Sequence, residues 1–298
     1  MLLPTDADDN EPASRAIALA DYGLHSAVKM AQACTREGLE HIIGLRVRVA
    51  PERRVRAWGE KPSELVLLVV DEEGWANVVA LCNLGWLSGY DRGPRIDLRD
   101  LSRHSDGLVC LSGAPGVGLL PRALEQVPDP TLPAEAIALA RQLAAIFPDR
   151  LYLELAYHGQ PLDRLVNRHV ITLAQRLDLP LVATGAVRFA TPADALAYTT
   201  LEAIGANKKV AGLVEARKND LPNVALDGNR AQAWLRSPRD MARLWGQLPA
   251  ALDATLDIAR RCTFRLPLAD GTPPEERYSP RLFFGPSRQE AESASEAH

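Results

Sequence analysis

The sequence lacks several features that would place a chain in a familiar class. No apolar run approaches the roughly 20 residues that a membrane-spanning helix needs, and the N-terminus has neither a basic leader nor an apolar signal core. We therefore expect a cytoplasmic protein without a membrane partner. Scattered cysteines without a CxxC pair argue against a metal knuckle or a redox couple and favour packed, reduced thiols. These are Cys34, Cys82, Cys110 and Cys262.

Catalytic motifs are also scarce. The six histidines form no HxH, HExxH or HxxxH pair, and no GxSxG nucleophile elbow occurs. The glycine-rich string SGAPGVG lacks the Lys and Ser/Thr of a P-loop, so a plain turn is favoured over a phosphate cradle. With 34 Lys+Arg against 38 Asp+Glu the net charge is −4, which argues against a dedicated DNA-binding module.

What the sequence does contain is a regular alternation of strands and helices. Its 298 residues, 47% of them hydrophobic, are ample for a sizeable core. Apolar strand-like strings are separated by amphipathic helical strings, which is typical of a parallel sheet covered on both faces or closed into a barrel. The expected strands are RAIALAD, HIIGLRVRV, LVLLVVD, GLVCLSG, RLYLELA and LPLVATG. The fold class is therefore α/β.

The chain changes character after this alternation. From about residue 191, the strings TPADALAYTTLEAIG, SPRDMARLWGQL and PAALDATLDIARRC predict three helices that pack around one end of the α/β unit. Residues 206–230 read as a long surface loop. By composition, residues 1–14 form a disordered arm and residues 269–298 a disordered tail. The ordered domain is thus expected to span residues 15–268.

Among single residues, His158 has the most suggestive position. It directly follows the string LYLELA, and α/β folds place their chemistry at the carboxyl ends of strands. The alternative is a histidine that caps a turn before Gly159. By contrast, His169 lies within a helical string and is expected on the helix surface. Four tryptophans in helical patterns are expected as core or interface anchors: Trp75, Trp86, Trp234 and Trp245.

Arginines crowd into the string RVRVAPERRVR. Its five members, all within eleven residues, are Arg46, Arg48, Arg53, Arg54 and Arg56. Such a cluster can contact phosphates, which makes binding of single-stranded nucleic acid one hypothesis. The alternative is a solvated hairpin whose charged outer edge prevents edge-to-edge pairing.

Five collinear strings carry a family resemblance. They are IALADYGLHSAVKMAQACTREGLEHIIGLRVRV, SELVLLVVDEEGWANVVALCNLGWL, HSDGLVCLSGAPGVG, LYLELAYHGQPLDRLVNRHVITLAQRLDLPLVATGAVRFATPADALAY and WLRSPRDMARLWGQLPAALDATLDIARRCTFRLPL. Together they resemble the polymerase and histidinol phosphatase (PHP) domain of bacterial DNA polymerase III alpha subunits, closest to the error-prone paralogue. The resemblance implies a distorted (β/α)7 barrel with a zinc, manganese or iron cluster at the strand ends. It also implies phosphoesterase or 3'-5' exonuclease activity in some members.

Residue by residue, most of the family's metal ligands are not matched. Asp21 matches the family's aspartate and His158 its histidine after LYLEL, and we regard both as vestigial. The family's opening strand, with its histidine pair, has no counterpart, so the barrel is expected to lack its first strand. Other ligand positions carry residues that cannot bind a metal in the same way: Tyr22, Arg46, Ala186 and Arg188.

These replacements predict that the pocket at the strand ends, where the family holds its metal cluster, contains no metal cofactor in this chain. A guanidinium group cannot deprotonate and would repel a cation. We expect Arg46 and Arg188 to pair with Asp21, which would balance the charge of the former metal pocket. The alternative is that the two arginines hold a phosphate.

No polymerase palm or fingers sequence follows the resemblance, so we expect no polymerase active site. The leading hypothesis is a non-catalytic binding or scaffold module of DNA replication or repair, related to the error-prone polymerase. Its expected partner is a DNA polymerase subunit or a translesion factor. One alternative is a residual metal-dependent phosphoesterase or 3'-5' exonuclease that uses Asp21 and His158. Another is a single-stranded nucleic-acid binder.

Overall fold

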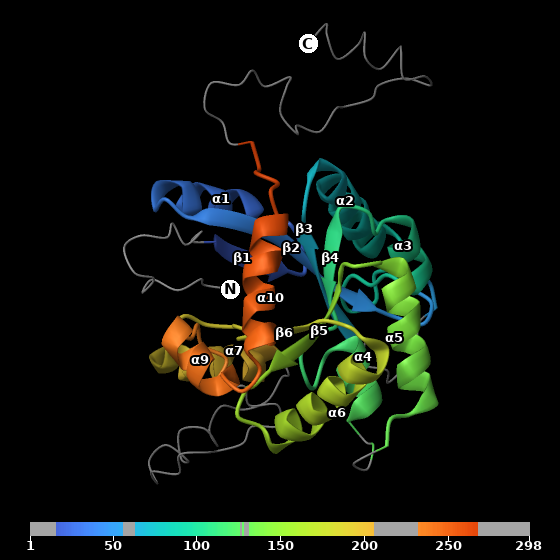
Figure 1. Cartoon of the computed structure of the whole chain (residues 1–298). Helices are drawn as coiled ribbons and strands as arrows, with labels where there is room; N and C mark the ends of the chain where they lie inside the picture. The colour runs from blue at the N-terminus through green and yellow to red at the C-terminus, as the bar shows by residue number, and fades with distance from the viewer. Residues whose placement is uncertain (1–15, 56–62, 126, 128–130, 206–231, 268–298) are drawn as a thin grey trace, which may run out of the picture. The chain divides into compact units, whose positions relative to one another are not determined.

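The computed structural model (Figure 1) describes residues 16–55, 63–125, 127, 131–205 and 232–267. The predicted arm at 1–14, the predicted loop at 206–230 and the tail at 269–298 lie outside the described residues, as does Arg56. Within the described part, no helix is both long enough and apolar enough to cross a membrane.

Six strands form one sheet in the order in which they occur along the chain. They are β1 (Ala16–Asp21), β2 (Glu40–Val49), β3 (Ser63–Val69), β4 (Leu108–Leu111), β5 (Leu151–Ala156) and β6 (Leu181–Thr184). All six were expected from the sequence. β3 runs antiparallel to both β2 and β4 while the other pairs are parallel, which differs from the expected parallel sheet, whereas the hairpin alternative for the string RVRVAPERRVR implies such a β2–β3 pair. Residues 50–55 form turns instead of a crossover helix, so the chain returns beside β2 in the opposite direction.

Helices alternate with the strands and follow them. They are α1 (Ala27–Arg36), α2 (Glu72–Leu87), α3 (Leu98–Arg103), α4 (Leu119–Leu124), α5 (Ala134–Ile146), α6 (Pro161–Leu177), a 3-10 turn η1 (Pro192–Asp194), α7 (Ala195–Gly205), α9 (Pro238–Trp245) and α10 (Pro249–Arg261). Side-chain caps define several starts: the Asp71 carboxylate accepts from the Gly74 backbone N–H at 2.9 Å, and Ser237 caps α9 ahead of a proline. The predicted C-terminal helical extension is confirmed.

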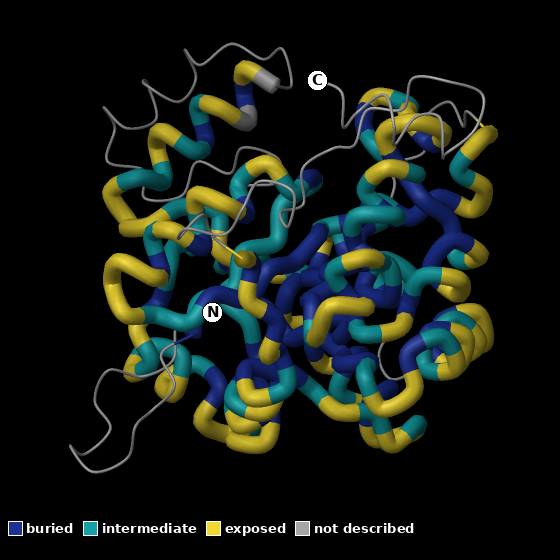
Figure 2. Tube along the Cα trace, turned by 90° about the horizontal axis from the view of Figure 1, so that it is seen from above, coloured by how far each residue is buried: buried dark blue, intermediate teal, exposed yellow. Residues whose placement is uncertain are grey.

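The face of the sheet that packs against α10 is called the inner face. In Figure 1, α10 runs lengthwise beside the strands. One end of this face is apolar and packs against α10, and we call it the apolar end. The buried residues there include Ala16, Ile42, Leu68, Val109, Tyr152 and Val182 from the strands and Ala254, Ile258, Ala259 and Cys262 from α10. Figure 2 shows the strands as the buried centre, with exposed residues on the outer sides of the helices.

The same face becomes polar at the carboxyl ends of the parallel strands. Strand alternation and register place Arg46 and Arg48 of β2 on this face, in line with Glu64 at the start of β3. Glu154 of β5 and Thr184 of β6 lie on it as well. Because β3 is antiparallel to β2, the beginning of β3, including Glu64, lies at the edge where β2 ends. We call this region the polar end of the inner face.

Within the described residues, β1 and β6 are the two edges of the sheet. Two smaller expectations are wrong. His169 is only 1% exposed, because it shares the inward face of α6 with Val166 and Val170. Trp234 is not helical and forms an isolated bridge with Phe189.

Candidate functional site at the polar end of the inner face

The centre of the polar end is one carboxylate between two guanidinium groups. Arg46 Nη1 donates to Glu64 Oε2 at 3.2 Å, and Arg188 Nη2 lies 3.9 Å from the same oxygen. The Tyr22 hydroxyl donates to the other oxygen, Oε1. The charged side chains are 10–16% exposed, so water screens them little. We call these four residues the Glu64 network.

This arrangement changes the proton affinity of its members. Burial would by itself raise the pKa of Glu64, but the hydrogen bond from Tyr22 and the charges of Arg46 and Arg188 outweigh burial, so the pKa lies below its usual value. Burial and the neighbouring Glu64 raise the pKa of Tyr22. Glu64 is therefore ionised and Tyr22 is a neutral donor at physiological pH.

The glycine-rich turn after β4 holds the backbone of Glu64 in place. The Glu64 N–H donates to the Val117 carbonyl at 2.8 Å, and a side chain at Gly113 would collide with the Glu64 carbonyl. Within this turn the Gly116 N–H donates to Glu125 and the Gly118 N–H donates to Ala114. These N–H groups already have partners, which fits the expected plain turn and not a phosphate cradle.

A second carboxylate, Glu154, lies deeper on the same face. Its side chain is buried, Thr184 Oγ1 donates to Oε1, and Oε2 has no hydrogen-bond partner. Burial raises the pKa of Glu154, although the hydrogen bond from Thr184 and the charges of Arg46, His158 and Arg188 act in the opposite direction. The pKa values of Glu64 and Glu154 are thus shifted in opposite directions at one end of one sheet.

His158 is buried directly after β5. Asp163 of α6 fixes it: the His158 N–H donates to Asp163 Oδ2 at 2.7 Å, and the ring Nδ1 lies 3.6 Å from Oδ1. Burial opposes ionisation of Asp163, but its contacts with His158 and the Gln160 N–H lower its pKa. The ring Nε2 is buried without a hydrogen-bond partner. β5 ends at Ala156, so His158 lies in the turn that continues through Gly159, whose φ is +92°.

The expected pairing of the two arginines with Asp21 is wrong. Side chains alternate along β1, so Asp21 points to the face opposite Ala20 and away from the Glu64 network. Its Oδ2 lies 3.4 Å from His25 Nε2, and both side chains are largely exposed. The carboxylate that pairs with Arg46 is Glu64, which sequence reasoning missed.

Ala186 occupies a strained turn between β6 and Arg188. Its φ is +41°, in the left-handed region that disfavours a side chain, and its N–H donates to Thr184 Oγ1 at 3.3 Å. The Arg188 N–H then donates to the Ala233 carbonyl at 2.8 Å. The turn thereby directs the Arg188 guanidinium toward the Glu64 network.

The arginine-rich string does not form one patch. Arg53 Nη1 lies 2.8 Å from Asp100 Oδ1 and 3.8 Å from Asp97 Oδ2, so acidic residues of α3 and its cap compensate its charge. Arg54 is exposed, and Arg56 lies outside the described residues. Arg46 and Arg48 instead lie on the inner face.

These residues do not fit a metal cluster. Among the residues that the structure describes, no three His, Cys, Asp or Glu side chains converge to hold a cation. Glu64 already accepts from Tyr22 and Arg46, and a cation there would lie beside two guanidinium groups. Sequence alone offered one signal for Glu154, a lone acidic residue inside the otherwise apolar string LYLELA.

Comparisons with known proteins identify the family and the relatives of this chain. The PHP domain family matches residues 11–158. DNA polymerase III subunit alpha of Treponema pallidum is 33% identical over 258 residues, which cover 85% of this chain and 21% of that protein. The same subunit of Thermus aquaticus is 30% identical over 273 residues, or 88% of this chain and 21% of the relative. The chain thus spans about a fifth of the length of the curated relatives it matches.

Among solved structures, a protein from Bifidobacterium adolescentis described as a proposed metal-dependent phosphoesterase is 14% identical. The match covers 57% of this chain and 76% of that one, with a TM-score of 0.33, which is too low to support an argument. The family assignment rests on the PHP match and on the polymerase relatives. They show that this chain is a PHP domain of the DNA polymerase III subunit alpha type.

Proposed function

We propose that this chain is a non-catalytic PHP module of the replication or repair machinery. One observation carries the proposal: two guanidinium groups and a phenol surround Glu64 where a metal-dependent PHP site would gather carboxylates and imidazoles. A metal-dependent catalyst needs carboxylate ligands whose negative charge is available to neutralise the metal ions. In this chain the carboxylate charge is neutralised by the protein's own side chains.

The proposed role is to bind and stabilise a partner in the cytoplasm. Sequence similarity to a polymerase subunit supports a DNA polymerase subunit or a translesion factor as that partner. The proposed role in repair rests on the resemblance of the sequence strings to the error-prone paralogue. Ion pairs that replace a metal would keep the strand ends ordered without catalysis. The inherited fold then serves as a rigid body on which an assembly is built.

The test combines an activity assay with affinity capture. The purified full chain is titrated with manganese, zinc and iron in a fluorogenic phosphodiester assay and is used as bait in an extract of its native host. We expect no metal-dependent turnover, and we expect mass spectrometry to identify a DNA polymerase subunit or a translesion factor. Metal-dependent turnover that is lost in His158→Gln would contradict the proposal.

A residual phosphoesterase or 3'-5' exonuclease is the second candidate, and a specific observation favours it. Glu154 Oε2 in β5 and His158 Nε2 just beyond the end of that strand are both buried without hydrogen-bond partners. A group with a raised pKa beside an imidazole is a reasonable acid–base pair. In the same assay, loss of activity in both Glu154→Gln and His158→Gln would favour this candidate. Asp21→Asn is the matched control, because Asp21 points away from the site.

A further inference from the structure

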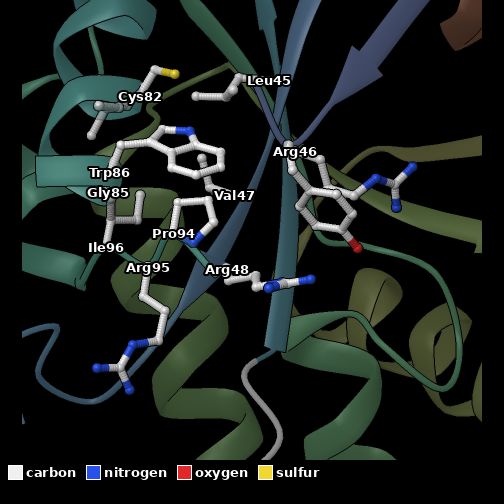
Figure 3. Close-up of a pocket in the computed structure, with 12 residues that line it drawn as sticks. Leu45, Arg46, Val47, Arg48, Cys82, Gly85, Trp86, Pro94, Arg95 and Ile96 are labelled. Carbon is white, nitrogen blue, oxygen red and sulfur yellow. The ribbon is translucent and has the colours of Figure 1, made fainter. Parts of the chain in front are cut away.

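A small pocket adjoins the Glu64 network on the side of α2. Figure 3 shows it between β2, the last turns of α2 and the segment 94–96. Its lining includes Tyr22, Arg46, Arg48, Trp86, Pro94 and Arg95. Trp86 lies next to Pro94, Arg48 extends below them, and the guanidinium of Arg95 points away (Figure 3). Aromatic and arginine side chains therefore share one depression.

The charge of this pocket is positive. Three arginines line it and no carboxylate does. Two of these arginines have acidic partners: Arg46 pairs with Glu64, and Arg95 Nη1 lies 3.3 Å from Asp91 Oδ2. Arg48 differs, because its guanidinium lies 4.5 Å from the centroid of the Tyr22 ring and donates to a backbone carbonyl. In the described part of the chain, no carboxylate lies within ion-pair distance of Arg48, so its charge remains uncompensated.

The loop that follows α2 holds Arg48 in this position. Arg48 Nη1 donates to the Arg92 carbonyl at 3.3 Å. The next residue, Gly93, has a φ of +145°, and a Cβ there would lie 1.8 Å from the same nitrogen. A Cβ at Gly89 would lie 1.9 Å from the Arg95 carbonyl oxygen. Only a glycine allows so close an approach, so Gly93 is required for the observed position of the Arg48 guanidinium against this loop.

An aromatic surface lies beside this charge. Trp86 is 47% exposed and Tyr90 is 55% exposed, and their rings stack with centroids 5.6 Å apart and planes 29° from parallel. Leu87, next to Trp86, is 85% exposed. Large aromatic side chains usually bury most of their surface, so an exposed stacked pair beside an arginine that has no acidic partner among the described residues is unusual for a structural element.

We propose that the surface formed by Arg48 and the stacked rings of Trp86 and Tyr90, beside this small pocket, binds a nucleotide of single-stranded nucleic acid. The base stacks on the exposed rings of Trp86 and Tyr90, and the phosphodiester lies against Arg48. A duplex hides the faces of its bases, so the ligand is single-stranded. An acidic protein segment would match the charge of Arg48 but would leave the exposed aromatic rings without a stacking partner. This inference does not depend on whether the Glu64 network excludes a metal.

The test measures binding of a short fluorescein-labelled oligothymidylate by fluorescence anisotropy at low salt. We expect Trp86→Ala to weaken binding at least about fivefold, because it removes the stacking surface. Trp86→Phe keeps an aromatic ring and is expected to retain most of the affinity. We expect Arg48→Gln to weaken binding and to reduce the slope of log affinity against log salt by about one.

Arg260→Gln is the matched control. Arg260 is an exposed arginine on α10, remote in sequence from the pocket and paired with Asp257, and its replacement should leave affinity and salt slope unchanged. An absence of binding at low salt would overturn the proposal. So would equal affinity of Trp86→Ala, Arg48→Gln and the unaltered chain, provided that circular dichroism shows that the variants are folded. Equal binding of an abasic strand would overturn the stacking that the proposal requires.

Discussion

The two ends of the inner face are built from the same strands and are stabilised in different ways. At the apolar end, aliphatic side chains of the strands pack against α10, and their burial depends little on pH. At the polar end, only a few residues away on the same strands, the carboxylate of Glu64 is paired with arginine side chains in the Glu64 network. The comparison shows that a PHP-type sheet can keep its hydrophobic core while the chemistry of its strand ends is replaced. Substitutions at the two ends should therefore have different signatures.

The largest effect is expected at the apolar end. Ile258→Ala removes buried methyl groups from α10 and leaves a cavity, which should lower the free energy of unfolding by about 3–4 kcal/mol in urea titrations. The control is Leu201→Ala on α7, where the side chain is 67% exposed and the loss should stay within about 0.5 kcal/mol. Equal losses in both variants would mean that α10 does not pack on the sheet as described.

A smaller loss is expected when one partner of the Glu64 network is removed. Arg46→Met should lower the free energy of unfolding by about 3 kcal/mol, because the buried carboxylate of Glu64 then keeps its charge but loses its ion pair with Arg46. Adding Glu64→Leu should recover much of the loss, since the uncompensated charge is then absent. Thermal or urea unfolding of the two single variants and the double variant measures this coupling. Simple additivity would contradict the pairing.

The pH dependence of stability should separate the two glutamates. Glu64 has a lowered pKa, so its contribution is present above the usual glutamate pKa of 4.5 and is lost as the pH falls through the folded value. Glu154 has a raised pKa, so the folded state loses stability as the pH rises above 4.5 through the folded value.

Unfolding titrations across this pH range test the contrast. Relative to the unaltered chain, Glu64→Gln should be less stable at neutral pH and should approach it on acidification. Glu154→Gln should gain stability relative to the unaltered chain as the pH rises from acid to neutral. If both variants change in the same direction with pH, the assignment of opposite pKa shifts is wrong.

The smallest expected effect concerns the turn after β6. Ala186 has a positive φ, and Ala186→Gly should raise the free energy of unfolding by about 0.5–1 kcal/mol by relieving that strain. Ala183→Gly within β6 is the matched control and should destabilise instead. Differential scanning calorimetry resolves the two signs. A loss of stability in Ala186→Gly would contradict the strained turn.

Much of the fold could be read from the alternation of apolar strings, including all six strands and the C-terminal helices. The polar end was only partly predictable. The family resemblance singled out Arg46 and Arg188, but their partner depends on the antiparallel direction of β3, which brings Glu64 to the strand ends. Asp21, the expected partner, is one position out of phase with the inner face. A shift of one residue reverses the direction of a strand side chain, and no sequence pattern showed this phase.

The most direct test of the central claim is a crystal structure of the full chain grown with manganese or zinc and measured at the metal's absorption edge. We predict no anomalous peak among Glu64, Glu154 and His158, and we predict that Arg46 remains in hydrogen-bond contact with Glu64. A strong peak within bonding distance of these side chains, about 2.0–2.3 Å, with Arg46 displaced from Glu64, would contradict the account.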